Sequence, residues 1–129
     1  MIDESVEGFS EKVKILYQYG VKTEVKKEKN VDVTEPFNVY ISGIDVDGPI
    51  TTNSRSDVNL IMTVNPQTKK ILLTTTPRDY YVTIPEVSGE KRDKLTHAGI
   101  YGVDRSMATL ENLYGIDISY YARINLHHL

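Results

Sequence analysis

Two strand-like runs separated by a turn limit the folds that are open to this chain. Residues 58–64 form an apolar run rich in β-branched side chains, which suits a strand buried in a sheet. The residues that follow, Asn65-Pro66-Gln67-Thr68, are turn-forming types, and residues 70–76 form a second strand-like run. Strand, turn and strand in this order predict a β-hairpin, so a sheet must lie at the centre of the fold.

Further strands are predicted on both sides of the hairpin. Residues 37–41 alternate in strand fashion, with Phe37, Val39 and Ile41 on one face. Residues 118–124 predict a final strand. Two weaker candidates are residues 80–84, as a short strand, and the Lys- and Glu-rich residues 22–35, as a solvated linker or a weak edge strand.

Helical spacing of apolar residues completes the pattern. It predicts a helix over residues 8–20 and another over residues 104–114, which Gly115 ends. A third helix begins at about Lys94 and is broken near Gly99 and Gly102. Strands and helices on one core predict an α/β (α+β mixed) domain, in which a layered sheet has flanking helices.

Composition excludes several classes of protein. The chain has 129 residues, a net charge of −3 and no cysteine, which rules out disulfides and cysteine-based metal sites. Its apolar runs are far shorter than the roughly 20 residues of a membrane-spanning helix, and its acidic first residues resemble no signal peptide. The acidic balance disfavours general nucleic-acid binding, so no nucleic-acid partner is expected.

The loop between the first two predicted core strands carries the candidate chemistry. Asp45 ends one strand and Asp57 opens the next, so neighbouring strands would bring both carboxylates to one sheet edge. Two carboxylates suit Mg²⁺, which fills its remaining positions with substrate phosphate oxygens and water. Arg55 and Arg78 offer planar donors for phosphate. From spacing alone this signal is weak, and turn capping and ordinary surface charge are the favoured explanation of the same residues.

Several segments, taken together in order and spacing, resemble the LytR-CpsA-Psr family. The matching segments are Gly43-Ile44-Asp45, Ser54-Arg55-Ser56-Asp57, Thr76-Pro77-Arg78-Asp79, Asp93-Lys94-Leu95-Thr96-His97-Ala98 with Gly102, and Tyr120-Tyr121-Ala122-Arg123-Ile124-Asn125. The residues and spacing of these segments are most similar to those of the streptococcal capsule members of the family. Residues 1–129 would then be one N-terminal portion of the family's catalytic domain, with an opening helix and charged connector over 1–36 and the core over 37–126.

The resemblance implies a phosphotransferase at the extracytoplasmic face of the cell membrane. Its donor is a glycopolymer, capsular polysaccharide or teichoic acid, linked to polyprenyl pyrophosphate, and its acceptor is peptidoglycan. The family's metal-binding aspartates carry over to Asp45 and Asp57, with Mg²⁺ or Mn²⁺ as the cofactor, and its pyrophosphate-binding arginines to Arg55 and Arg78. The resemblance leaves the identity of the general base open, although Asp45 could help deprotonate the incoming hydroxyl.

The chain also departs from the family pattern. It stops at the end of a strand, before the family's second arginine cluster, and the family's N-terminal membrane anchor is not in it; Asn125-Leu126 replaces the usual asparagine-phenylalanine. We therefore expect a fragment of a longer protein that folds but does not catalyse transfer. Two alternatives stay open: a transcriptional regulator of envelope or capsule genes, and a module that binds polyprenyl phosphates without catalysis.

Other residues receive structural interpretations at this point. His97 is expected to be structural or solvent-facing, and His127 and His128 to reflect the composition of the tail. Asp79 is expected to orient Arg78. The pairs Tyr80-Tyr81 and Tyr120-Tyr121 are expected to pack in a sheet rather than stack on sugar or lipid.

Overall fold

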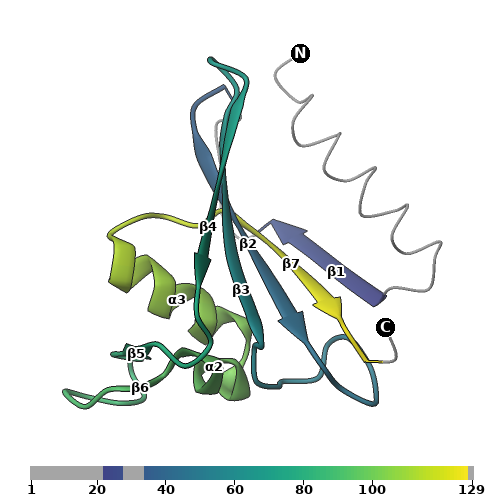
Figure 1. The fold of residues 1–129 in the computed structure, drawn as a ribbon, viewed down its shortest axis with the longest axis vertical. Coiled ribbons are helices and arrows are strands. Elements are labelled where there is room, and N and C mark those ends of the chain that lie inside the picture. Colours follow the sequence, from purple (N-terminus) through teal and green to yellow (C-terminus); the bar gives the residue numbers. More distant parts are fainter. Residues whose placement is uncertain (1–21, 28–33, 128–129) are drawn as a thin grey trace.

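A five-stranded mixed sheet forms the centre of the molecule (Figure 1). The computed structural model describes residues 22–27 and 34–127, so the helix predicted over residues 8–20 lies outside the described residues. The strand order is β1-β7-β2-β3-β4. The strands are β1 (Lys22–Lys27), β2 (Phe37–Ile44), β3 (Val58–Asn65), β4 (Lys70–Thr76) and β7 (Tyr120–Asn125). The last strand of the chain therefore lies inside the sheet, antiparallel to β1 and parallel to β2.

The predicted hairpin is confirmed as β3 and β4. Its turn is closed by the Asn65 side chain, whose Oδ1 accepts hydrogen bonds from the backbone N–H groups of Gln67 and Thr68. Lys69 completes the turn with a left-handed backbone (φ 58°). A side chain of the predicted turn, Asn65, thus satisfies backbone N–H groups at the tip of the hairpin.

Helices cover one face of the sheet next to β2 and β3. They are α2 (Leu95–Ala98), the 3₁₀ turn η1 (Gly99–Tyr101) and α3 (Val103–Tyr114). The predicted break falls at Gly99 and Gly102, and Gly115 ends α3 in the left-handed conformation that favours glycine (φ 65°). A small two-stranded sheet, β5 (Tyr81–Val82) with β6 (Asp93–Lys94), joins the hairpin to α2. Among the described residues, no helix is long and apolar enough to cross a membrane.

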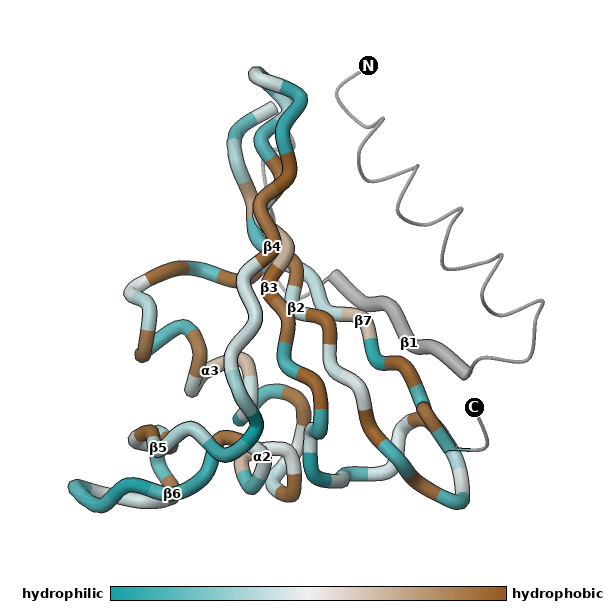
Figure 2. Tube along the Cα trace, in the orientation of Figure 1, coloured by the Kyte–Doolittle hydropathy of each residue, from teal (hydrophilic) through white to brown (hydrophobic). Residues whose placement is uncertain are grey.

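The sheet buries apolar side chains on both of its faces, as the hydropathy of β2 and β3 suggests (Figure 2). Tyr40 and Ile61 join Leu110 and other residues in the larger core under the helices. On the opposite face, Phe37 and Val39 belong to a smaller cluster, which Val64 completes. The alternation predicted along residues 37–41 is therefore confirmed, and so is the mixed fold with helices on a layered sheet.

The boundaries of several elements differ from the sequence-based prediction. The strand predicted to end at residue 41 continues to Ile44, because its pairing with both β3 and β7 extends through Ser42 and Gly43. The final strand begins at Tyr120 rather than at residue 118. The weak edge strand expected within residues 22–35 is found as β1, which pairs only with β7 among the described strands.

An acid–histidine pair stabilises the entry to α2. Asp93 Oδ1 lies 2.8 Å from His97 Nδ1 and accepts a hydrogen bond from the backbone N–H of Lys94. The hydrogen bond with His97 is the main cause that holds the pKa of Asp93 below its ordinary value of 3.8, and the Lys94 N–H adds to it. The ionised form of Asp93 therefore contributes stability above about pH 4, which is lost as pH falls through the lowered pKa.

We predict that His97→Gln raises the pKa of Asp93 toward its ordinary value, because the largest cause of its lowering is removed. The measurement is an NMR titration of the Asp93 carboxyl carbon. His127→Gln, which changes a histidine that is paired with Asp45, should leave the Asp93 midpoint unchanged. An unmoved midpoint in His97→Gln would assign the lowering to the Lys94 N–H instead.

Candidate functional site

The site loop, predicted over residues 42–56, spans residues 45–57 in the structure and connects the end of β2 to the start of β3. The backbone N–H of Asp57 donates to the carbonyl of Gly43 at 2.7 Å, which closes the base of the loop. Asn125 on β7 holds the first part: its side-chain amide donates to the Val46 carbonyl at 2.9 Å and accepts from the Val46 N–H at 3.1 Å. The loop is thus fixed to two strands of the sheet.

The second half of the loop packs against the helical layer. The backbone N–H of Ser56 donates to the Thr96 carbonyl of α2 at 3.2 Å. A Cβ built on Gly99 would collide with the Ser54 carbonyl oxygen and come within 2.9 Å of the Ser56 nitrogen. This contact leaves room for glycine alone, so α2 and η1 fix the backbone that carries Arg55.

Asp57 and Arg78 form the shortest ion pair of the site. Arg78 follows β4, and its Nη1 lies 2.6 Å from Asp57 Oδ1. Both side chains are partly exposed, at 43% for Arg78 and 31% for Asp57. The expected partner, Asp79, is more distant, with 3.8 Å between its Oδ1 and Arg78 Nε. Asp79 thus forms a second, longer ion pair with Arg78, as expected, and Asp57 is the closer partner because the antiparallel pairing of β3 and β4 brings it near.

Asp45 has a different partner. Its Oδ1 lies 2.7 Å from His127 Nδ1, and His127 Nε2 lies 4.0 Å from an oxygen of Asp47. The chain continues beside β2 after β7 ends, since Leu126 N–H donates to the Ile44 carbonyl at 2.6 Å. This pairing delivers His127 to the site loop, so interpreting His127 as mere tail composition is not sufficient.

The four predicted site residues therefore separate into three groups. Asp57 and Arg78 are joined, Asp45 contacts His127, and Arg55 is exposed and makes no ion pair within the described part of the chain. The backbones of Asp45 and Asp57 do lie at the same end of neighbouring strands. Binding of one cation by both carboxylates stays a prediction, and in the described ranges no three acidic, histidine or cysteine side chains converge as a metal cluster.

A buried network of hydroxyl groups lies beneath the loop. Ser56 Oγ is 3.0 Å from the Tyr40 hydroxyl and 2.6 Å from Ser42 Oγ, and Tyr40 also donates to Asn59. Burial raises the pKa of the Tyr40 hydroxyl above its ordinary value, so the group stays neutral. The loop is thus anchored from below by uncharged hydrogen bonds.

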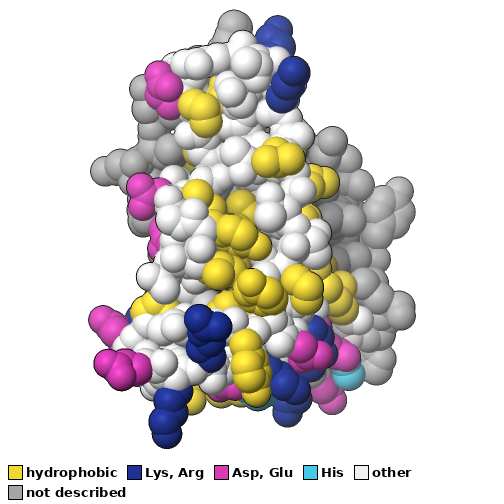
Figure 3. All heavy atoms as spheres, turned by 60° about the vertical axis from the view of Figure 1, so that its left-hand side comes forward, with side chains coloured by type: hydrophobic (Ala, Val, Ile, Leu, Met, Phe, Trp, Pro, Cys, Tyr) yellow, Lys and Arg dark blue, Asp and Glu magenta, His cyan; other side chains and the backbone are white. Residues whose placement is uncertain are grey.

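One further cation, Arg123 on β7, was missed as a candidate for chemistry. It is 4% exposed, and its Nη2 donates to the Thr52 carbonyl of the site loop at 2.7 Å. The sequence holds a signal for its burial, because Arg123 lies two residues after Tyr121 and so shares its inward face. Charged side chains of both signs gather at the lower end of the molecule (Figure 3).

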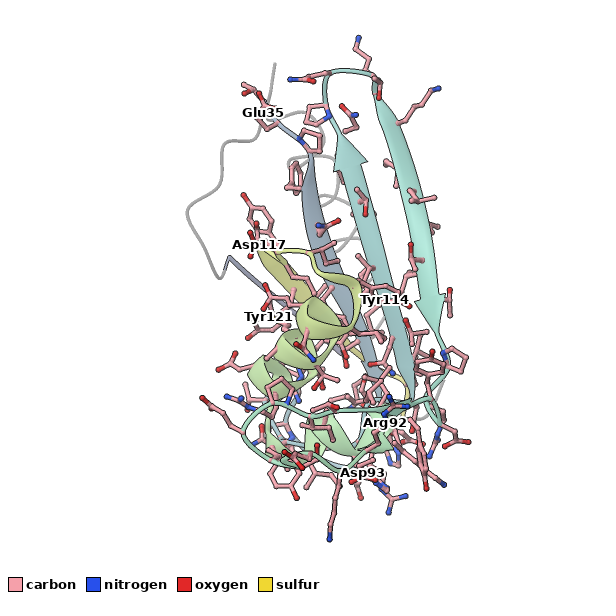
Figure 4. The ribbon with its side chains drawn as sticks, turned by 90° about the vertical axis from the view of Figure 1, so that its left-hand side faces the viewer. Glu35, Arg92, Asp93, Tyr114, Asp117 and Tyr121 are labelled. Carbon is pink, nitrogen blue, oxygen red and sulfur yellow. The ribbon has the colours of Figure 1, made fainter. Side chains whose placement is uncertain are left out.

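The paired tyrosines behave differently from each other. Tyr120 and Tyr121 pack in the sheet as expected, Tyr120 against Phe37 with 5.5 Å between ring centroids. Tyr80 and Tyr81 instead are 50% and 63% exposed, so the expectation that they pack in a sheet is wrong. They line an open hollow of about 230 Å³ between the hairpin connection and α3, together with Arg92 (Figure 4), Asn112 and Leu113.

Comparison with known proteins assigns the chain to a family. The model of the LytR_cpsA_psr family matches residues 4–129. This chain belongs to that family. It is 39% identical over 109 residues to the polyisoprenyl-teichoic acid–peptidoglycan teichoic acid transferase TagU of Enterococcus faecalis, a match that covers 82% of the chain and 35% of TagU. The chain therefore spans about a third of the length of that relative.

Solved structures of the family share the fold. TagT bound to LI-WTA matches with a TM-score of 0.64 at 36% identity, over 75% of this chain and 36% of TagT. TagT with bound octaprenyl pyrophosphate lipid matches with a TM-score of 0.59 at 36% identity, over 72% of this chain and 35% of that one. The layered fold described above is thus the fold of part of the LytR_cpsA_psr domain.

Proposed function

We propose that this family member carries part of the active site of a phosphotransferase that transfers a glycopolymer from polyprenyl pyrophosphate to peptidoglycan. The observation that carries the proposal is the Asp57–Arg78 pair, held at the end of neighbouring strands beside the loop that bears Asp45 and Arg55. The name of the E. faecalis relative, a teichoic acid transferase acting on peptidoglycan, supports the reaction class. The proposed glycopolymer is either teichoic acid or capsular polysaccharide.

The two arginines suit the charge of such a donor. A pyrophosphate develops negative charge on its oxygens during transfer, and fixed positive groups stabilise that charge. Arg55 is exposed and unpaired among the described residues, so its guanidinium is available to a ligand. Arg78 uses Nη1 for Asp57, which fixes the guanidinium plane and leaves its other Nη group to donate.

The carboxylates fit a divalent cation completed by substrate. Asp45 and Asp57 each have one oxygen in a contact, with His127 and Arg78, and each retains a second oxygen. Hard oxygen donors of this kind suit Mg²⁺ or Mn²⁺, with phosphate oxygens and water as the other ligands. When bound, the cation would neutralise pyrophosphate charge. In this proposal Asp45 would also accept the proton of the acceptor hydroxyl.

An apolar side of the molecule suits the lipid part of the donor. Leu72 of β4 is 64% exposed. It is in register with Thr63, which lies two residues after Ile61 on β3, so Leu72 projects to the same face of the sheet as Ile61 and the helices. Tyr114 at the end of α3 is also exposed, and its hydroxyl lies 2.6 Å from Thr76 Oγ1. Figure 3 shows hydrophobic side chains along this side of the molecule. We assign this side to the polyprenyl chain, and place the whole protein at the outer face of the membrane.

Binding of inorganic pyrophosphate to this chain tests the proposal. With Mg²⁺ present, a pyrophosphate titration followed by NMR should shift residues 45–57 and 76–79. Arg78→Gln should weaken binding about tenfold, because it removes a charge-assisted contact of roughly 1.4 kcal/mol. Lys70→Gln removes one positive charge at the far end of the hairpin and should leave the affinity unchanged. Shifts restricted to His127 and the chain end would contradict the site.

A further inference from the structure

Arg123 is a buried cation whose charge is not balanced by the groups described around it. Its side chain is 4% exposed, yet within the described ranges its one hydrogen bond is that of Nη2 to the Thr52 carbonyl. Its Nε is buried and has no hydrogen-bond partner among the described residues. An arginine side chain keeps its proton at any physiological pH, so the cost of burying this charge cannot be avoided by loss of the proton.

The groups packed against Arg123 on the helix side are polar but uncharged. Ser42 is its register partner on β2, and Ser42 is hydrogen-bonded to Ser56 at 2.6 Å. Tyr40, two residues before Ser42 on β2, projects to the same face, and its hydroxyl lies 3.0 Å from Ser56 Oγ. Thr96 Oγ1 of α2 is a second buried atom without a hydrogen-bond partner. Two unsatisfied polar atoms thus occur in the layer that supports the site loop.

One acidic residue must be considered as an internal partner. The backbone register pairs Arg123 with Glu24 on β1. An internal Glu24–Arg123 pair would make Arg123 a structural residue. The two roles differ in their effect on stability: removing one member of a buried ion pair destabilises a protein, whereas removing an unbalanced buried charge does not.

We propose that Arg123 is a further anion-binding residue of the site, which donates from beneath the loop to a phosphate oxygen of the pyrophosphate. The inference rests on the proposed function and adds a deep contact to the surface arginines. The guanidinium already reaches residues 45–57 through Thr52, so a small displacement of that carbonyl gives an oxyanion access to it. A phosphate supplies the negative charge that the surrounding hydroxyl groups do not.

The direct test observes the side chain of Arg123 in the unaltered chain. Titration with inorganic pyrophosphate and Mg²⁺ should shift the Arg123 Nε–H resonance in NMR spectra and protect it from solvent exchange. A resonance that stays unchanged while the site loop shifts would overturn the proposal and leave the proposed function intact. Absence of any pyrophosphate binding would overturn both.

Variants separate the anion-binding role from a structural one. Arg123→Gln should keep or raise the thermal midpoint of the ligand-free chain and weaken pyrophosphate about tenfold or more, whereas Arg123→Lys should lose less affinity. Glu24→Gln should leave pyrophosphate affinity unchanged or slightly higher. The opposite pattern, in which Arg123→Gln and Glu24→Gln both lower the midpoint and neither changes affinity, would assign Arg123 to an internal ion pair. Lys70→Gln serves as the charge-matched control.

Discussion

In an assay with Mg²⁺ and a polyprenyl-pyrophosphate donor, this chain is expected to turn over at less than about a thousandth of the rate of the complete TagU domain. The match between the two covers 35% of TagU, and the family resemblance implies a second arginine cluster in the part of TagU outside that match. Loss of one preorganised contact to developing charge typically costs a factor of about 100 to 1,000 in rate. Loss of a whole cluster should therefore leave no detectable transfer.

The assay needs a control that separates missing chemistry from missing structure. Pyrophosphate binding measured on the same preparation of both proteins provides it, because Arg55 and Arg78 are present in this chain. The expected result is weaker but measurable binding without turnover, the behaviour of a binding module. Comparable turnover by the two proteins would show that residues 1–129 contain a complete active site.

The second large effect is expected from Gly99→Ala. An added Cβ collides with the Ser54 carbonyl oxygen and lies 2.9 Å from the Ser56 nitrogen, so the neighbouring backbone must move. Overpacking of this kind typically costs about 1–3 kcal/mol. The same movement displaces Arg55, so pyrophosphate shifts in the site loop should weaken in the molecules that remain folded. Chemical denaturation and the NMR titration measure the two effects.

The backbone of Gly99 makes this substitution a test of packing alone. Its φ of −63° and ψ of −23° are helical, a conformation in which alanine is favoured over glycine by about 1 kcal/mol. Gly48→Ala is the matched control, because its Cβ would meet only Thr52 Oγ1, at 3.7 Å. Gly48→Ala should change stability by less than about 0.5 kcal/mol. A Gly99→Ala variant as stable as the unaltered chain would show that the close packing of η1 does not fix the site loop.

Local sequence patterns predicted most of the elements. The hairpin followed from two strand-like runs and a turn whose Asn65 side chain satisfies the backbone, and α3 followed from helical spacing ended by Gly115. These features depend on neighbours within a few residues, which the sequence displays directly. The exposure of Tyr80 and Tyr81 was predicted wrongly, because β-propensity measures packing on a sheet and β5 has little sheet to pack on.

The sequence by itself determined which residues are candidates for phosphate chemistry, and its resemblance to a family named Asp45, Arg55, Asp57 and Arg78 together. Only the tertiary structure decided their partners. Insertion of β7 between β1 and β2 brings His127 to Asp45 and places Arg123 beneath the loop, across about 70 residues of sequence or more. Such contacts depend on strand order and register, which arise from the packing of the whole domain, whereas turns and helix ends depend on the residues beside them.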